Sequence, residues 1–230
     1  MNIKLSALAL GITLAYGATA AMAADVATIH QSGSFNDGMI EQFDNNGAIA
    51  AIITHGFDND ASIKQEQVTN ANATIYQHAN AGTASIDQGG SWSSGHYVNG
   101  HWPWHGPQWV EGTWSDGSNQ TAVINQTGGW GNDAWVTQTG QNVAAYINQS
   151  GFHNDAGIAQ AGSGSMNVAS IGQAGANNDG YIEQQGSNLV AAVLQSGMGH
   201  EAVITQVGSN KVASIVQYGG YQNNAYINQR

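Results

Sequence analysis

The chain has 230 residues, of which only 8% are charged, and it contains 31 Gly, 2 Pro and no Cys. Globular domains carry about 25% charged residues, so this composition is not that of an ordinary globular domain. With 4 basic against 15 acidic residues, the formal net charge is -11, which argues against nucleic acid and anionic membranes as partners. Because disulfides are excluded, we expect backbone and side-chain hydrogen-bond ladders to stabilise the fold.

The first residues have the pattern of a secretory signal peptide. Lys4 precedes an apolar run over residues 5–14, which is too short to span a bilayer. An Ala-Met-Ala triplet at 21–23 fits a cleavage site before Ala24. We therefore expect residues 1–23 to be removed, the mature chain to be secreted, and no membrane span to follow.

A short repeat fills the rest of the chain. Its pattern is a small residue, then Ile or Val, then Gln, each two positions apart, and often Gly two positions later, as in Ala27 to Gly33 and Ala202 to Gly208. Sixteen copies align, with markers eleven to thirteen residues apart except for one gap, between Gln88 and Gln126. The markers are Gln31, Gln42, Thr54, Gln65, Gln77, Gln88, Gln126, Gln138, Gln149, Gln160, Gln173, Gln184, Gln195, Gln206, Gln217 and Gln229.

The spacing within each copy is that of a β-strand, because residues two apart share one face of an extended chain. Gly and Asn gather between the copies, where the chain must reverse. The turns alternate between a longer Gly-x-x-Asn-Asp form, as at 151–155, and a shorter Gly-x-Asn form, as at 186–188. The sequence therefore predicts an all-β fold, a two-sided parallel β-solenoid of about eight strand-turn-strand-turn layers.

Parallel stacking would place equivalent side chains about 4.7–4.8 Å apart. We expect Ile and Val to form a thin core and the Gln amides to hydrogen-bond along the rod, since buried amides need partners. The repeats begin at Ala27 and run to Gln229, which leaves no room for capping units. Open strand edges invite another chain to add, so we predict self-association, head to tail, into a cross-β amyloid fibre.

The acids of the longer turns have two interpretations. Stacked on one edge they would repel one another and act as gatekeepers against association, or Asn-Asp is simply suitable turn chemistry. A calcium site is not favoured, because the Gly-Gly-x-Gly-x-Asp pattern of calcium-binding repeats is absent. The gatekeeper candidates are Asp37, Asp60, Asp133, Asp155 and Asp179.

One complete segment, Gln149-Ser-Gly-Phe-His-Asn-Asp-Ala-Gly-Ile-Ala-Gln160, follows the pattern Gln-x-Gly-x-x-Asn-x-Ala-x-x-x-Gln. This pattern resembles the curlin repeat of curli fibre subunits, and related segments cover nearly all of residues 24–230. The resemblance implies an extracellular fibre for adhesion and biofilm, other curli subunits as partners, and a dedicated outer-membrane secretion apparatus. The chain has more repeats than most curli subunits and lacks the Gly-rich export segment of the major ones. With so few basic residues it resembles a major subunit, and a minor, nucleating subunit is the alternative.

Residues 89–119 interrupt the repeats and hold both Pro and five of the seven Trp. Their stretches 97–102 and 109–114 resemble the Trp-x-x-Gly-x-Trp repeats of some exported bacterial proteins, a likeness that names no activity. Exposed aromatic side chains there would bind a sugar or a partner subunit; the alternative is that they pack together in a small β-flap. We thus expect curlin-like repeats over 24–88 and 120–230, with 89–119 as an inserted loop or hairpin.

No catalytic constellation is present, because Cys is absent and the acids lie in turns. We predict that the protein is not an enzyme and holds no cofactor or metal. The histidines of the insertion are candidate ligands, but two prolines there exclude the helical spacing that would bring them together; they are His96, His101 and His105. The alternative from another class is a soluble β-solenoid that binds carbohydrate or another surface.

Overall fold

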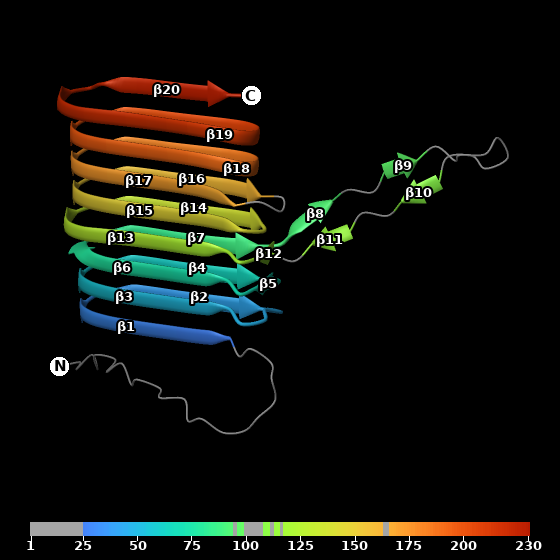
Figure 1. Ribbon diagram of the computed structural model, residues 1–230. Coiled ribbons are helices and arrows are strands. Elements are labelled where there is room, and N and C mark those ends of the chain that lie inside the picture. The colour runs from blue at the N-terminus through green and yellow to red at the C-terminus, as the bar shows by residue number, and fades with distance from the viewer. Residues whose placement is uncertain (1–24, 94–95, 99–107, 111–112, 116, 163–165) are drawn as a thin grey trace, which may run out of the picture.

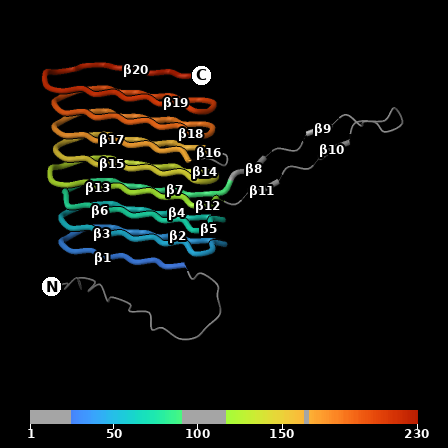
Figure 2. The backbone as a smooth tube through the Cα atoms, viewed as in Figure 1, coloured from blue at the N-terminus to red at the C-terminus, as the bar shows by residue number. Residues whose placement is uncertain are grey.

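The computed structural model describes residues 25–93, 96–98, 108–110, 113–115, 117–162 and 166–230. These residues contain twenty β-strands and no helix. Figure 1 shows the strands stacked in a two-sided rod, and Figure 2 follows the backbone as it winds from layer to layer. The predicted all-β, parallel β-solenoid is confirmed, whereas the candidate signal segment, residues 1–23, lies outside the described residues.

Each layer contributes one strand to each side of the rod. On the first side lie β1 (Val26–Ser34), β3 (Ile49–Phe57), β6 (Asn72–Asn80), β13 (Thr121–Trp130), β15 (Val143–Phe152) and β17 (Asn167–Ala176). On the second side lie β2 (Asp37–Phe43), β4 (Asp60–Glu66), β7 (Thr83–Gly89), β14 (Asp133–Gly140) and β16 (Asp155–Gly162). The last layers are β18 (Asp179–Met198), β19 (Glu201–Tyr221) and β20 (Asn224–Gln229).

The register places each residue over its equivalent in the next layer. Ile147 pairs with Ile171 on one side, and Ile158 pairs with Ile182 on the other. All of the pairings between successive layers are parallel. Side chains of one kind therefore form columns along the rod, as the repeat length predicted.

The core is a thin double column of isoleucines with alanines beside them. Ile52, Ile124 and Ile158 have no exposed surface, and they belong to a single apolar cluster that runs through the rod. The cluster is thin because the residues that each strand points inward are chiefly its small residue, its Ile or Val, and its Gln. Much of the buried interior is consequently polar, which makes its hydrogen bonding decisive.

The two edges of the rod turn differently. At the longer turns a glycine with positive φ approaches the next layer so closely that a side chain has no room, as at Gly151, where φ is 115°. At the other edge the turns are short. The strand pairing continues through them, so β18 and β19 each include a turn, at Asn188 and Asn210 respectively, and cover both sides of the rod. In the first layers this edge is broader and buries a small satellite core of Ala48, Val68 and Ala71.

The insertion leaves the rod between β7 and β13 as a two-stranded ribbon (Figure 1). Antiparallel pairs join β8 (Ser91–Ser93) to β11 (Thr113–Ser115) and β9 (His96–Val98) to β10 (Gln108–Val110). The chain returns through β12 (Gly117–Ser118), which pairs with β5 (Val68–Thr69). Because β13 pairs with β6 and β14 with β7, the stack of strands on each side of the rod continues past the insertion without a change of side.

The side chains of the candidate sugar-binding tryptophans of the insertion, and those of His96, His101 and His105, lie outside what the structure describes. The β-flap and the sugar-binding hypotheses for this segment therefore stay predictions. In the part of the chain that the structure describes, no helix has the length and hydropathy needed to cross a membrane.

Replacement of Gly151 tests the turn geometry. A Cβ at this position would lie 1.9 Å from the backbone oxygen of Gly175, so Gly151→Ala must distort two layers and should lower the free energy of unfolding by about 3 kcal/mol or more. The matched control is Gly128→Ala, where φ is 68° and no atom lies within 4 Å of the added Cβ. Urea denaturation of freshly diluted protein measures both, and equal losses would contradict the close-approach argument.

Candidate functional site

A continuous ladder of glutamine amides runs through the second side of the rod. In each step the Nε2 of one glutamine donates to the Oε1 of its equivalent in the next layer, at 2.8–3.0 Å. The ladder consists of Gln42, Gln65, Gln88, Gln138, Gln160, Gln184, Gln206 and Gln229. A second ladder on the first side has steps of 2.9–3.0 Å and joins Gln77, Gln126, Gln149, Gln173, Gln195 and Gln217.

These amides also bind the backbone of the turns. The Nε2 of Gln149 donates to the carbonyl oxygens of Asp133 and Asn154, at 2.8 and 2.7 Å, as well as to Gln173. Such sharing satisfies the donors of an amide with only 1% of its surface exposed. In both ladders every donor points toward the C-terminal layer, so each ladder has an acceptor end and a donor end.

The ladder on the first side is interrupted at Thr54. This residue occupies the glutamine position of β3 and is fully buried, but its side chain is too short to continue the amide row. As a result the Nε2 of Gln31, the Oγ1 of Thr54 and the Oε1 of Gln77 all lack a hydrogen-bond partner. Gln31 is thus the one predicted ladder glutamine among the described residues that the structure leaves outside the two ladders.

A third ladder, of asparagines, is one that the sequence reasoning missed. Asn154 is fully buried; its Nδ2 donates to the Oδ1 of Asn132 at 3.2 Å, and its Oδ1 accepts from the Nδ2 of Asn178 at 3.0 Å. The sequence pattern assigns the Asn of the Gly-x-x-Asn-Asp turn only to turn geometry. The signal for this row is the recurrence of Asn at one place in the Gly-x-x-Asn-Asp turns, which is the kind of recurrence that identifies the glutamines.

His200 takes the asparagine position in the following layer. Its backbone N–H donates to the Oδ1 of Asn178 at 3.1 Å, and its Nδ1 accepts from the backbone N–H of Asn223 at 3.2 Å. The imidazole is 1% exposed, and its Nε2 has no partner. The asparagine ladder therefore ends in a side chain of different shape near the C-terminal end of the rod.

The gatekeeper candidates stand in one column at the start of the second-side strands. Asp37 pairs in register with Asp60, and Asp155 pairs with Asp133 below and Asp179 above. Thr83 separates the two groups, and Glu201 extends the column beyond Asp179. Their repulsion in assembly stays a prediction, but the column that it requires is present.

Carboxylates in this column influence one another's ionisation. Partial burial raises the pKa of Asp155 above its ordinary 3.8, and the charges of Asp133 and Asp179 raise it further, while His153 opposes them. Partial burial, and then the charge of Glu201, raises the pKa of Asp179. The folded state therefore holds the protons of Asp155 and Asp179 more tightly than the unfolded chain does.

Metal coordination has no support from the geometry. Among the described residues, no three or more His, Asp or Glu side chains are grouped so that they can hold a metal ion. The buried polar side chains instead bind one another from layer to layer. The potential of the site is thus structural: it is a set of hydrogen-bond rows that another copy of the same layer can extend.

Parallel strands in near-identical layers, with glutamine, asparagine and isoleucine columns inside, define a β-solenoid repeat protein with open strand edges. More particularly, the family model of the curlin associated repeat matches residues 175–208, which run from the end of β17 through β18 into β19. The chain therefore carries the curlin repeat, as its sequence pattern predicted. A search of curated proteins gave no match.

Thr54→Gln should repair the interrupted ladder. The new amide can accept from Gln31 and donate to Gln77, and two added hydrogen bonds should raise the free energy of unfolding by about 2 kcal/mol. The matched control is Thr54→Val, which keeps the shape of Thr54 and leaves both amides unpaired. Urea denaturation compares the three proteins; if the Gln variant is no more stable than the Val variant, the repair argument is wrong.

Acidification should stabilise the column of acids. The pKa values of Asp155 and Asp179 are raised in the folded state. Protonation of the two carboxyls therefore stabilises the folded protein fully below about pH 3.8, and this contribution is lost as pH rises through the folded pKa values. Stability against urea should consequently increase on mild acidification from neutral pH, and Asp155→Asn with Asp179→Asn should reduce that increase. Asp44→Asn, outside the column, is the control; an unchanged pH dependence in the double variant would refute the assignment.

Proposed function

We propose that this protein is a structural subunit of a curli-type extracellular amyloid fibre, which supports surface adhesion and the biofilm matrix. The observation that carries the proposal is the pair of open strand edges. Among the strands that the structure describes, β1 pairs only with β3, β2 only with β4, and β20 only with β19. Unpaired edges of this kind are templates for a further strand.

The backbone groups at the edges are oriented for parallel addition. The N–H of Glu201 donates to the carbonyl of Asn223 in the next layer at 2.9 Å, as that of Asp179 does to His200 at 2.7 Å. Because donors alternate along a parallel strand, the N–H groups at the equivalent places of β20 face the open side. They belong to Asn224, Tyr226 and Asn228.

The side chains at the two ends also match. The second-side ladder begins at the Oε1 of Gln42 and ends at the Nε2 of Gln229, so a copy stacked in the same direction would continue it. In that register Ile227 lies over Ile40, and both are partly buried hydrophobic residues that pack against the core cluster. Docking would complete the burial of this column, and Ile29, which is 45% exposed, would be covered in the same way.

The remaining parts of the proposal follow from the curlin repeat and the signal-like N-terminus. We place the protein outside the cell, with export through a dedicated outer-membrane apparatus and with other curli subunits as partners. The fibre needs no catalysis, so the proposal assigns no enzymatic activity. A major or general subunit is preferred over a nucleating one, because the chain has only 4 basic residues.

Fibre formation is tested with residues 24–230, diluted from denaturant and followed by thioflavin fluorescence and electron microscopy. We expect fibres to appear after a lag that preformed seeds abolish. A stable, β-rich monomer that never polymerises, with or without seeds, would overturn the proposal and favour a solenoid that acts as a binding protein.

A single variant tests the edge itself. Asn228→Pro removes an N–H that faces the open side and places the proline ring where the next strand must add, so seeded elongation should fall about tenfold or more, as expected for a loss above 1.4 kcal/mol. The control, Asn228→Ala, retains the N–H and should elongate normally. Equal rates for the two variants, with unchanged circular dichroism, would show that β20 is not a growing edge.

A further inference from the structure

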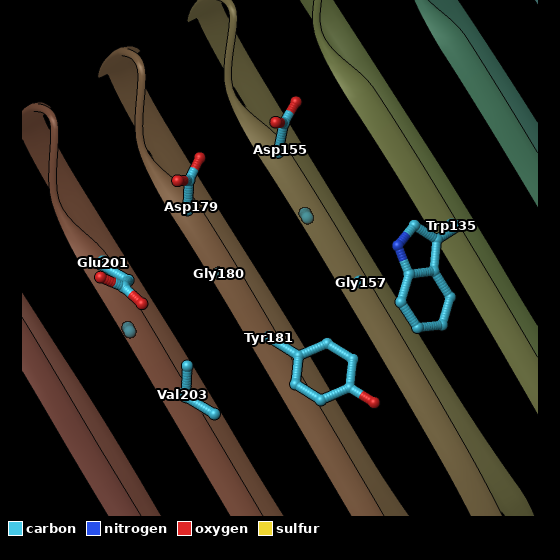
Figure 3. Close-up of a pocket in the computed structure, with 10 residues that line it drawn as sticks. Trp135, Asp155, Gly157, Asp179, Gly180, Tyr181, Glu201 and Val203 are labelled. Atoms are coloured by element: carbon cyan, nitrogen blue, oxygen red, sulfur yellow. The ribbon is translucent and has the colours of Figure 1, made fainter.

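A groove of about 230 Å³ crosses β14, β16, β18 and β19 on the outer surface of the rod (Figure 3). Carboxylates form one wall of it and aromatic and apolar side chains the other. The acidic wall is Asp155, Asp179 and Glu201, and the opposite wall is Trp135, Tyr181 and Val203. The groove lies within one copy of the chain and needs no neighbour to complete it.

The aromatic wall exists because of a glycine. Trp135 and Tyr181 come from strands two layers apart, yet their ring centroids are 5.7 Å from each other at an angle of 43°. Between them lies Gly157, where a Cβ would be 2.4 Å from the Trp135 ring. Without a side chain there, the two rings lean together, and 39% of Trp135 remains exposed. The result is an apolar platform open to solvent.

No basic residue lines the acidic wall, although His153 lies close enough to oppose the neighbouring charges at Asp155 and the Tyr226 hydroxyl donates a hydrogen bond to Glu201. The three carboxylates of this wall follow one another in register, one per layer, and no residue that lines the groove is basic. Lys64 is paired with Glu66 at 2.7 Å, and Lys211 donates to the carbonyl of Arg230 at 3.1 Å. Lys64 and Lys211 are thus engaged elsewhere, and the carboxylates of the groove carry a net negative charge that a cation from outside can meet.

We propose that the groove binds a linear polysaccharide of amino sugars, lying along the rod. The flat faces of its sugar rings would pack on Trp135 and Tyr181, and its ammonium groups would donate charge-assisted hydrogen bonds to the carboxylates of Asp155, Asp179 and Glu201. Carboxylates repeated at every layer suit a polymer with regularly spaced amines better than a single small cation. A neutral sugar would leave them unbalanced, and a lysine peptide would leave the platform empty.

Calorimetric titration of the unpolymerised full chain with a glucosamine hexamer tests the proposal. Two probes separate the contributions: an N-acetylglucosamine hexamer, which keeps the rings without the charge, and hexalysine, which keeps the charge without the rings. We expect the glucosamine hexamer to bind most tightly, and its affinity to fall with added salt. Because no fibre is required, the outcome is independent of whether the chain polymerises.

Variants locate the binding in the groove. Trp135→Ala and Asp179→Asn should each weaken it about tenfold, and Gly157→Ala, which displaces the Trp135 ring, should act in the same direction. The control is Tyr146→Ala on β15, where an equally exposed tyrosine, at 40%, lies on the opposite side of the rod. Circular dichroism verifies that each variant is folded.

Several results would overturn the assignment. They are the absence of binding, equal binding of the N-acetylated hexamer, equal binding of hexalysine, and a loss in Tyr146→Ala as large as that in Trp135→Ala. The first three would exclude the ligand class, and the last would place the binding elsewhere on the chain.

Discussion

An amide that is removed from water must find partners for its donors and its acceptor, and this requirement governs the interior of the rod. A fully buried glutamine such as Gln138 meets it by bonding its own equivalents, Gln88 and Gln160, in the layers on either side. No layer can do this alone. The polar core therefore requires the same residue at the same place in successive layers. The hydrogen bonds of the amides fix the register of the layers, and the isoleucines stack in columns in that register.

The two kinds of column differ in their tolerance of change. Val136 replaces isoleucine between Ile86 and Ile158, and the column remains closed, since apolar contact has no direction. Thr54, by contrast, is a smaller residue at a glutamine position, and it leaves three polar atoms without a hydrogen-bond partner. A conservative change in volume is therefore harmless in one row and disruptive in the row beside it, because hydrogen bonds are directional and must be matched one to one.

Much of this architecture could be predicted from the sequence, because residues two apart identify strands and markers at nearly constant intervals identify layers. The parallel solenoid and the position of Gln149 over its equivalents follow from those two periods. Asn154 recurs in the same manner, but the sequence also explains it without burial, since asparagine is common in turns for purely local reasons. The contact between the rings of Trp135 and Tyr181 could not be predicted either. It depends on the absence of a side chain at Gly157, which has this effect only when the three strands are in register.

The direction of the amide ladders gives the rod a polarity. Both glutamine rows donate toward the C-terminal layer, whereas the asparagine row donates toward the N-terminal layer. Two rows of aligned amide dipoles opposed by one leave a residual dipole along the axis. Copies that meet with their axes parallel bring donor to acceptor, while inverted copies bring donor to donor. An end-to-end assembly of parallel copies would inherit this direction and have two chemically distinct tips, with the glutamine rows presenting amide hydrogens at one and amide oxygens at the other.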